Sequence, residues 1–126
     1  MKEEIGFEDF AKLDIRIGTI VEAEVPEWSH WVMRLKVDFG EEIGKRTIFA
    51  GIMKFYESKD ITGKQFPFVV NIKPKRIGPA NDQGEYEYSQ GMMMAADKII
   101  DPDKPEEGKP VLFRLSEEVP NGTLVR

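Results

Sequence analysis

Apolar and polar side chains alternate most regularly between residues 31 and 39, and this pattern predicts a β-strand. Successive side chains of a strand point to opposite faces of the sheet, so this strand has one buried face and one polar face. The apolar positions share one parity: Trp31, Met33, Leu35, Val37 and Phe39. The register therefore places Trp31 with the buried residues.

Strand-forming residues also occur on both sides of this segment. Residues 14–23 form a long run of mostly β-branched side chains around Gly18, and a glycine inside a strand favours a bulge or a sharp bend. Residues 26–30 are predicted as a loop, and residues 46–50 as a third strand that ends at Gly51. A bend at Gly18 would be typical of a small barrel, in which bent strands turn the corners.

A short helix is predicted after the third strand. Ser58 can cap a helical turn that Gly63 ends, because serine oxygens accept hydrogen bonds from free helix N–H groups and glycine adopts the left-handed conformation of a helix terminus. The apolar side chains of this region are expected to turn inward beneath the sheet; they are Phe55, Tyr56 and Ile61.

Two further strands are predicted after the helix, at residues 66–73 and 91–96. Residues 79–88 between them are rich in Gly, Asn, Asp and Gln, which is typical of an exposed loop. Pro67 cannot donate a backbone hydrogen bond, so its position near the start of the strand indicates an edge or an exposed donor position.

The order of these elements predicts an all-β protein. Three strands, one short helix and two more strands match a five-stranded OB-fold barrel, an architecture that binds oligonucleotides. We expect one domain over residues 7–126, with the barrel at about 7–97 and a C-terminal extension at about 98–126. The extension contains a short strand at 111–115 and a turn at 120–122.

The composition leaves little material for catalysis. The 126 residues include no cysteine and one histidine, His30, so disulfides, thiolate metal sites and a nucleophile activated by a histidine partner are not expected. We therefore expect no enzyme activity, no cofactor and no metal. No apolar run approaches the ~20 residues of a membrane span, so a cytoplasmic location without membrane contact is expected.

Charge is distributed unevenly along the chain. The net charge of −5 argues against a nucleic-acid partner, but residues 44–78 carry eight basic and two acidic side chains, a net of +6. The remaining residues carry −11. Such a protein can bind a polyanion on one face while its other faces repel it.

The basic segment contains a candidate contact surface at the predicted end of the 66–73 strand, Asn71-Ile72-Lys73-Pro74-Lys75-Arg76. Alternation places Asn71 and Lys73 on the face opposite Ile72, and Pro74 stiffens the chain as it leaves the strand. Amide and cationic donors held on a rigid element suit phosphate and sugar contacts. Residue chemistry alone leaves an RNA contact and a solvated strand end equally open.

Several motifs of the chain, in order over about residues 7–97, strongly resemble the EMAP/Myf-type tRNA-binding domain. They are Asp14-Ile15-Arg16-Ile17-Gly18-Thr19-Ile20, Leu35-Lys36-Val37-Asp38-Phe39-Gly40, Val70-Asn71-Ile72-Lys73-Pro74-Lys75-Arg76-Ile77-Gly78 and Ser89-Gln90-Gly91-Met92-Met93-Met94-Ala95-Ala96. Members of that family have an OB-fold, recognise tRNA by shape, and occur as appendages of aminoacyl-tRNA synthetases and as free homodimers.

The resemblance implies which residues face RNA. Those on the RNA surface would be Asn71, Lys73, Lys75 and Arg76, with Ser89 and Met92 beside them and Arg46 and Lys54 flanking them. Ser89 would either bind a phosphate or order the loop before the fifth strand. Met93 is expected to fill the core, and Asp14 and Arg16 to pair structurally. An exposed tryptophan would stack on a base, although Trp31 fits the buried register.

A second resemblance concerns the segments around these motifs. Residues 38–44, Ile77-Gly78-Pro79 and Glu118-Val119-Pro120-Asn121-Gly122 are similar to the CsaA subgroup, described as export-related chaperones that bind peptides. The chain departs from that subgroup in Asn71-Ile72-Lys73-Pro74-Lys75, where an apolar residue and a second proline are usual. It also retains Ser89, Gly91 and Met92, which members of the subgroup tend to lose. The resemblances imply tRNA as partner, a homodimer formed through the extension, and a synthetase as a further candidate partner; the alternative is a peptide-binding chaperone.

Overall fold

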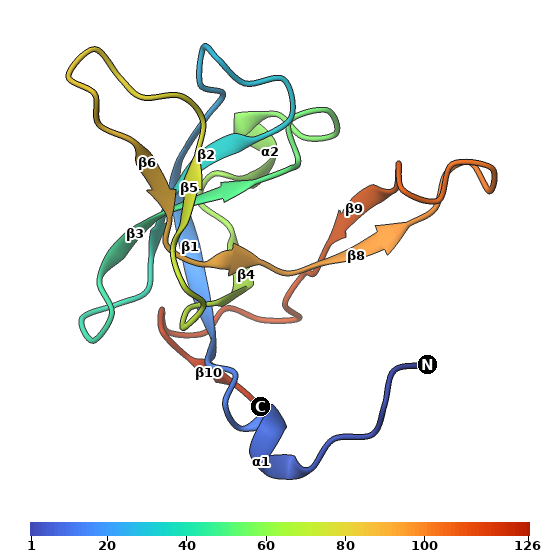
Figure 1. The fold of residues 1–126 in the computed structure, drawn as a ribbon. Coiled ribbons are helices and arrows are strands. Elements are labelled where there is room, and N and C mark those ends of the chain that lie inside the picture. Colours follow the sequence, from blue (N-terminus) through green and yellow to red (C-terminus); the bar gives the residue numbers. More distant parts are fainter.

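One long strand, β1 (Ile15–Glu24), organises the sheet, because it pairs along different parts of its length with three other strands. The computed structural model describes all of residues 1–126. The first half of β1 pairs with β4 (Gln65–Val69) and the second half with β2 (Met33–Asp38). Its first residues also pair with β10 (Leu124–Val125), which ties the C-terminus to the sheet (Figure 1).

Five antiparallel strands form a nearly closed barrel. Their order is β3-β2-β1-β4-β7, with β3 at Lys45–Ala50 and β7 at Met92–Met93. The backbone N–H of Gln90 donates to the carbonyl of Thr47 at 2.9 Å, which joins the end of this path back to β3. The predicted all-β, OB-like class is therefore confirmed.

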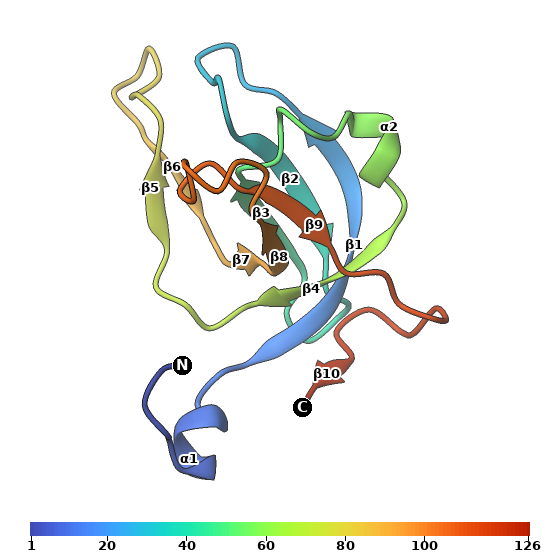
Figure 2. The same cartoon turned by 90° about the vertical axis from the view of Figure 1, so that its right-hand side faces the viewer.

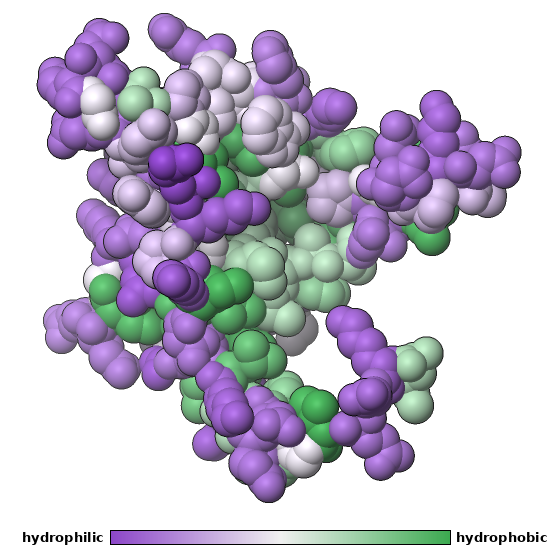
Figure 3. Space-filling model, viewed as in Figure 1, coloured by the Kyte–Doolittle hydropathy of each residue, from purple (hydrophilic) through white to green (hydrophobic).

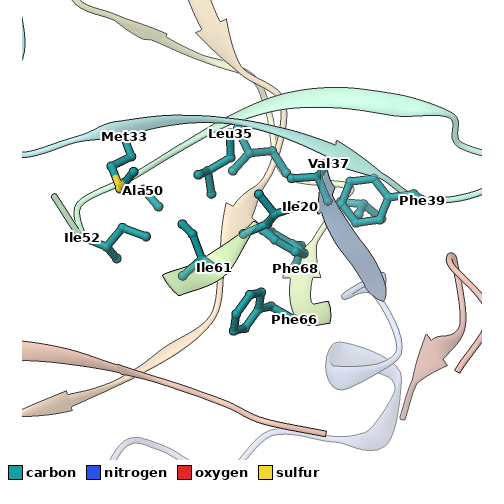
Figure 4. Close-up of a cluster of buried hydrophobic side chains, with 12 residues drawn as sticks. Ile20, Met33, Leu35, Val37, Phe39, Ala50, Ile52, Ile61, Phe66 and Phe68 are labelled. Atoms are coloured by element: carbon teal, nitrogen blue, oxygen red, sulfur yellow. The ribbon is translucent and has the colours of Figure 1, made fainter. Parts of the chain in front are cut away.

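The barrel interior is filled by aliphatic and aromatic side chains (Figure 4). Phe39 and Phe68 meet edge to face, with ring centroids 5.4 Å apart. Met93 packs against the cluster from its margin, as expected of a gap-filling methionine. The twelve buried members are Ile20, Met33, Leu35, Val37, Phe39, Ile48, Ala50, Ile52, Ile61, Phe66, Phe68 and Val70.

The predicted helix is α2 (Ser58–Ile61), but its capping residue is Glu57 rather than Ser58. The backbone N–H of Glu57 donates to the Asp60 carboxylate at 2.8 Å, and the Ser58 hydroxyl donates instead to the carbonyl of Ala23. Gly63 follows the helix with φ of +82°, as predicted. Ile61 is buried and Tyr56 half-buried, whereas Phe55 is exposed, contrary to the expectation.

The predicted strand 66–73 ends earlier than expected. β4 stops at Val69, and after an irregular stretch at 70–74 the chain enters β5 (Lys75–Ile77), which pairs with β6 (Glu87–Ser89). Pro74 has no N–H to donate to a strand ladder, and the Asn71 side chain bonds to backbone groups of the N-terminal segment. The two short strands form a hairpin that the sequence pattern did not reveal.

The predicted strand 91–96 is also divided. The N–H of Met94 donates to the carbonyl of Pro67, after which the chain leaves the barrel as β8 (Ala95–Lys98). β8 pairs only with β9 (Lys109–Leu112), so the predicted strand 111–115 is shifted towards the N-terminus. The resulting ribbon projects from the barrel (Figures 1 and 2).

Two backbone expectations are corrected. Pro67 is buried in an inner strand, where its missing N–H falls on the side of the two-residue strand β7. The bulge in β1 lies between Ile20 and Glu22, not at Gly18.

A short helix at the N-terminus, α1 (Phe7–Phe10), was not predicted. Neither helix is long and apolar enough to cross a membrane.

Gly18 is needed for close packing between strands, and a methyl group there is expected to destabilise the barrel. A Cβ at this position would lie 2.5 Å from Cγ1 of Val37 and 2.7 Å from Cε1 of Phe39. We expect Gly18→Ala to lower the free energy of unfolding by about 1–3 kcal/mol, measured by urea denaturation. Gly51→Ala is the control, because the nearest atom to its Cβ is 4.0 Å away; equal stability of both variants would contradict the packing role.

Candidate nucleic-acid interface

The candidate interface is the outer face of β2 and β3 between two flanking segments. These are residues 25–32, here called the tryptophan loop, and residues 75–89, here called the hairpin, which comprises β5, β6 and their connection. Both segments extend from the same end of the barrel (Figures 1 and 2), and they meet where Trp28 contacts Gly78. The outer face of β2 and β3 with its two flanking loops is the surface on which OB-folds bind oligonucleotides.

Trp28 fixes the hairpin to the tryptophan loop. Its ring packs against Gly78, which has φ of +74°, and a Cβ there would lie 2.5 Å from the ring. Trp28 also contacts the rings of Phe49 and Trp31, at centroid distances of 6.1 and 6.5 Å. Glycine at position 78 therefore provides both the backbone conformation and the space for the indole.

An ion pair adds a second attachment of the hairpin to the barrel. Nε of Arg34 in β2 donates to Oε1 of Glu87 in β6 at 2.7 Å, and Nη1 donates to Glu24 at 2.7 Å. The bond to Glu87, assisted by Glu24, holds the pKa of Arg34 above its ordinary value. The guanidinium also lies over the ring of Phe49 at 5.7 Å. This arginine thus orients the hairpin and is already neutralised by carboxylates.

Ser89 and Gln90 close the barrel at the base of the hairpin. The buried hydroxyl of Ser89 accepts a hydrogen bond from the N–H of Phe49 at 3.0 Å and donates to the carbonyl of Gly91 at 3.0 Å. The side-chain oxygen of Gln90 accepts from the N–H of Thr47 at 3.0 Å. Of the two roles considered for Ser89, this geometry supports the ordering of the chain.

Two other candidate contact residues also bond within the protein. Asn71 accepts from the N–H of Asp14 at 2.9 Å and donates to the carbonyl of Lys12 at 2.6 Å. Arg46 donates to the carbonyls of Val70 and Gln90 at 2.6 and 3.2 Å. These side chains hold the irregular stretch 70–74 against the barrel and so position the residues that follow it.

The remaining candidate cations are free to meet a ligand. They are exposed, have no carboxylate within ion-pair distance, and comprise Lys54, Lys73, Lys75 and Arg76. Lys36 and Lys45, on the polar face of β2 and β3, share these properties and were not among the candidates. Lys36 alternates with the apolar residues of the predicted strand 31–39, and this pattern could have identified it. Lys45 precedes the predicted strand 46–50, so no such signal was available for it. Hydrophilic side chains gather over β5 and β6, beside an apolar area over β4 and the start of β8 (Figure 3).

Trp31 is exposed, with 54% of its surface accessible, and the prediction that it is buried was wrong. The Ser29 hydroxyl accepts from the N–H of Val32 and donates to its carbonyl, so the chain turns here and β2 begins only at Met33. Val32 and Met33 are consequently both buried, and the alternation does not extend to Trp31. Met92 is half exposed.

Asp14 and Arg16 have the structural role expected of them. Nε of Arg16 donates to the Asp14 carboxylate at 2.6 Å, and Nη1 donates to the carbonyl of Gly122 at 3.1 Å. Asp14, with help from Glu42, raises the pKa of Arg16. The arginine therefore binds the C-terminal turn to β1.

Comparison with known families confirms the resemblance to a tRNA-binding domain. Residues 15–124 match the family model described as "Putative tRNA binding domain". The chain belongs to this tRNA-binding domain family. It is 38% identical to a methionine–tRNA ligase of Methanothrix thermoacetophila over 99% of its own length, but covers only 16% of that enzyme.

Two solved structures resemble this family member over nearly their whole length. A MetRS related protein from Pyrococcus horikoshii superposes with a TM-score of 0.77 and 34% identity, covering 99% of this chain and 100% of that one. The chaperone CsaA from Bacillus anthracis superposes with a TM-score of 0.78 and 33% identity, covering 98% and 100%. The fold is thus shared by solved proteins that are described differently, one as a MetRS related protein and one as a chaperone.

The buried position of Ser89 leads to a testable distinction. Ser89→Ala leaves the buried N–H of Phe49 without its acceptor, and we expect a loss of about 1–3 kcal/mol in the free energy of unfolding. Chemical denaturation measures this loss, and Ser116→Ala, at an exposed serine of the extension, is the control. Unchanged stability together with weakened RNA binding would instead indicate a direct contact between the hydroxyl and RNA.

Proposed function

We propose that this protein is a non-catalytic module that binds folded tRNA through the hairpin and the outer face of β2 and β3. The observation that carries the proposal is the group of exposed, unpaired cations Lys73, Lys75 and Arg76 at one edge of this face. They lie within the segment 44–78, whose net charge is +6 in an otherwise acidic chain. Family membership supports tRNA as the ligand.

The binding mode follows from the chemistry of these side chains. Lysine ammonium groups contact phosphates as point charges, and such contacts position RNA without reading its sequence. Lys36 and Lys45 extend the cationic surface along the strands, Lys54 lies beyond the end of β3, and Met92 supplies an apolar margin. Affinity for many tRNAs through backbone and shape is the expected result.

Asn71, Ser89 and Arg46 contribute to binding by preorganisation in this proposal. Their hydrogen bonds hold the 70–74 stretch and the base of the hairpin in place before RNA arrives. Donors that are already ordered lose less conformational entropy on binding. The three residues remain candidates for RNA contact, with the unpaired cations as the principal ones.

We further propose a homodimer formed through the C-terminal extension. The β8–β9 ribbon pairs with no other strand, and a two-stranded ribbon alone is marginally stable. Exposed apolar side chains lie on or beside it: Ile99, Ile100, Val111 and Phe113. A second copy would cover this surface and double the RNA footprint. An aminoacyl-tRNA synthetase is the other candidate partner of the module.

One observation favours a second function, the binding of unfolded peptides. A cavity of about 760 Å³ lies between residues 55–66, which include α2, and residues 111–118. Its apolar lining comes from both segments and includes Phe55, Tyr56, Ile61, Phe66, Val111, Leu112 and Leu115. The CsaA neighbour is described as a chaperone, and this cavity is where an apolar peptide side chain would fit.

Binding of bulk tRNA is expected to depend strongly on salt. If about four phosphates are neutralised, affinity falls on the order of 100-fold between 50 and 200 mM salt. The triple variant Lys73→Ala/Lys75→Ala/Arg76→Ala should weaken binding and reduce the salt slope by about three. Gel shift or fluorescence anisotropy over a salt series measures both effects.

A control with the same charge change separates local contacts from net charge. Lys2→Ala/Lys59→Ala/Lys104→Ala removes three exposed lysines outside the face and should bind nearly as the wild type does. Equal losses in both triple variants would contradict the proposed site. Absence of any shift with wild-type protein, together with measurable binding to an unfolded polypeptide, would support the chaperone function instead.

The proposed dimer surface is tested through its apolar residues. Ile99→Asp/Ile100→Asp places two charges in the interface and should convert a dimer into a monomer, measured by light scattering coupled to size exclusion. Ile5→Asp, at an equally exposed isoleucine near the N-terminus, should leave the mass unchanged. A monomeric wild type, or a double variant that remains dimeric, would contradict the proposal.

A further inference from the structure

The hairpin carries aromatic side chains on the side that faces away from the barrel. Glu87 and Ser89 point towards the barrel, where they bond to Arg34 and to the N–H of Phe49. Tyr88 lies between them in β6, so its ring points outward, and Tyr86 has the same parity. Their accessible fractions are 50% and 43%.

A cation completes this outward surface. Arg76 in β5 is directly opposite Tyr88 in the register, and its guanidinium lies over the ring of Tyr86 at 4.2 Å. The three side chains thus present planar groups at neighbouring positions of one two-stranded ribbon. None belongs to the hydrophobic core, so their arrangement is not required for packing of the barrel.

We infer that this outer side of the hairpin is a stacking site for unpaired nucleotide bases. Bases that are not paired in a helix stack on aromatic rings and on arginine guanidinium planes, whereas bases inside a duplex already stack on each other. The inference rests on the proposed RNA-binding function and narrows it: the preferred RNA presents a single-stranded segment at the hairpin.

The surroundings of the stacking site suit the backbone of such a segment. At the base of the hairpin, Thr47, Pro74, Glu87 and Gln90 line a cleft that Tyr88 also borders, on the other side of the ribbon from the outward face of the tyrosine ring. Lys73 and Lys75 flank Pro74 in the chain, both exposed and without carboxylate partners. A nucleotide stacked on Tyr88 would therefore have cations nearby for its phosphates.

The hairpin is also held firmly enough to serve as a platform. Trp28 packs against Gly78 at one end of β5, and the pair between Arg34 and Glu87 holds β6. An aromatic side chain on an anchored ribbon loses little freedom when a base stacks on it, so most of the stacking energy appears as affinity. Trp31 is exposed on the neighbouring loop and extends the aromatic surface beyond Trp28.

The test compares three RNAs: bulk tRNA, a single-stranded adenylate oligomer of about ten nucleotides, and an abasic ribose-phosphate oligomer of the same length. Wild-type protein should bind the adenylate oligomer about tenfold more tightly than the abasic one. Tyr88→Ala should remove most of this difference and leave abasic binding and the salt slope unchanged. Tyr88→Phe should behave as the wild type, because it keeps the ring.

Two further variants isolate the stacking contribution. Arg76→Lys keeps the positive charge but removes the planar guanidinium on which a base would stack. It should therefore lower the affinity for the adenylate oligomer while preserving the dependence of affinity on salt concentration. Phe7→Ala removes an exposed aromatic ring far from the hairpin and should change nothing. If the wild-type protein binds tRNA but binds the adenylate and abasic oligomers equally, the stacking site is contradicted and the proposed RNA-binding function is not. Absence of salt-dependent binding to all three RNAs would overturn the proposed function as well.

Discussion

The junction between β3 and residues 89–91 is the constraint on which the rest of the molecule depends. The path of five strands ends at β7, which has two residues, so backbone pairing alone closes little of the barrel. Three hydrogen bonds complete the closure. The Ser89 hydroxyl accepts from the N–H of Phe49, and the Gln90 side chain accepts from the N–H of Thr47. The backbone N–H of Gln90 also donates to the carbonyl of Thr47. Without these bonds β3 would present a free edge, with unsatisfied N–H groups beside the core.

The same junction determines where the hairpin stands. Ser89 is the last residue of β6, so the bonds that close the barrel also fix one end of the ribbon that carries Arg76 and Tyr88. Trp28 against Gly78 and the pair between Arg34 and Glu87 fix the remainder. Barrel stability and geometry of the candidate interface are therefore coupled, and a change at the junction is expected to affect both.

Local patterns predicted the parts of the fold that depend on local physics. Alternation located β2, and Gly63 located the end of α2, because burial parity and backbone conformation are visible in a few residues. The β5–β6 and β8–β9 ribbons were missed because each depends on pairing between segments separated by polar loops. Whether a polar side chain bonds within its own protein is also a long-range property, so the sequence did not reveal the internal hydrogen bonds of Asn71, Ser89 and Arg46. The exposure of the candidate lysines was easier to predict, because a lysine side chain is almost never fully buried unless it is paired.

The proposed interface combines charge interactions with phosphates and stacking on bases, and these two kinds of contact act over different distances. Charge interactions persist over roughly 8–10 Å at physiological ionic strength, so the +6 segment and the −11 remainder together orient an approaching polyanion towards the hairpin. Stacking requires direct contact, and it acts only after this orientation. Cationic residues are therefore expected to govern the association rate and its salt dependence, whereas Tyr88 and its neighbours govern dissociation. On this proposal, the module would meet many RNAs at similar rates and retain those that offer an unpaired base at the hairpin.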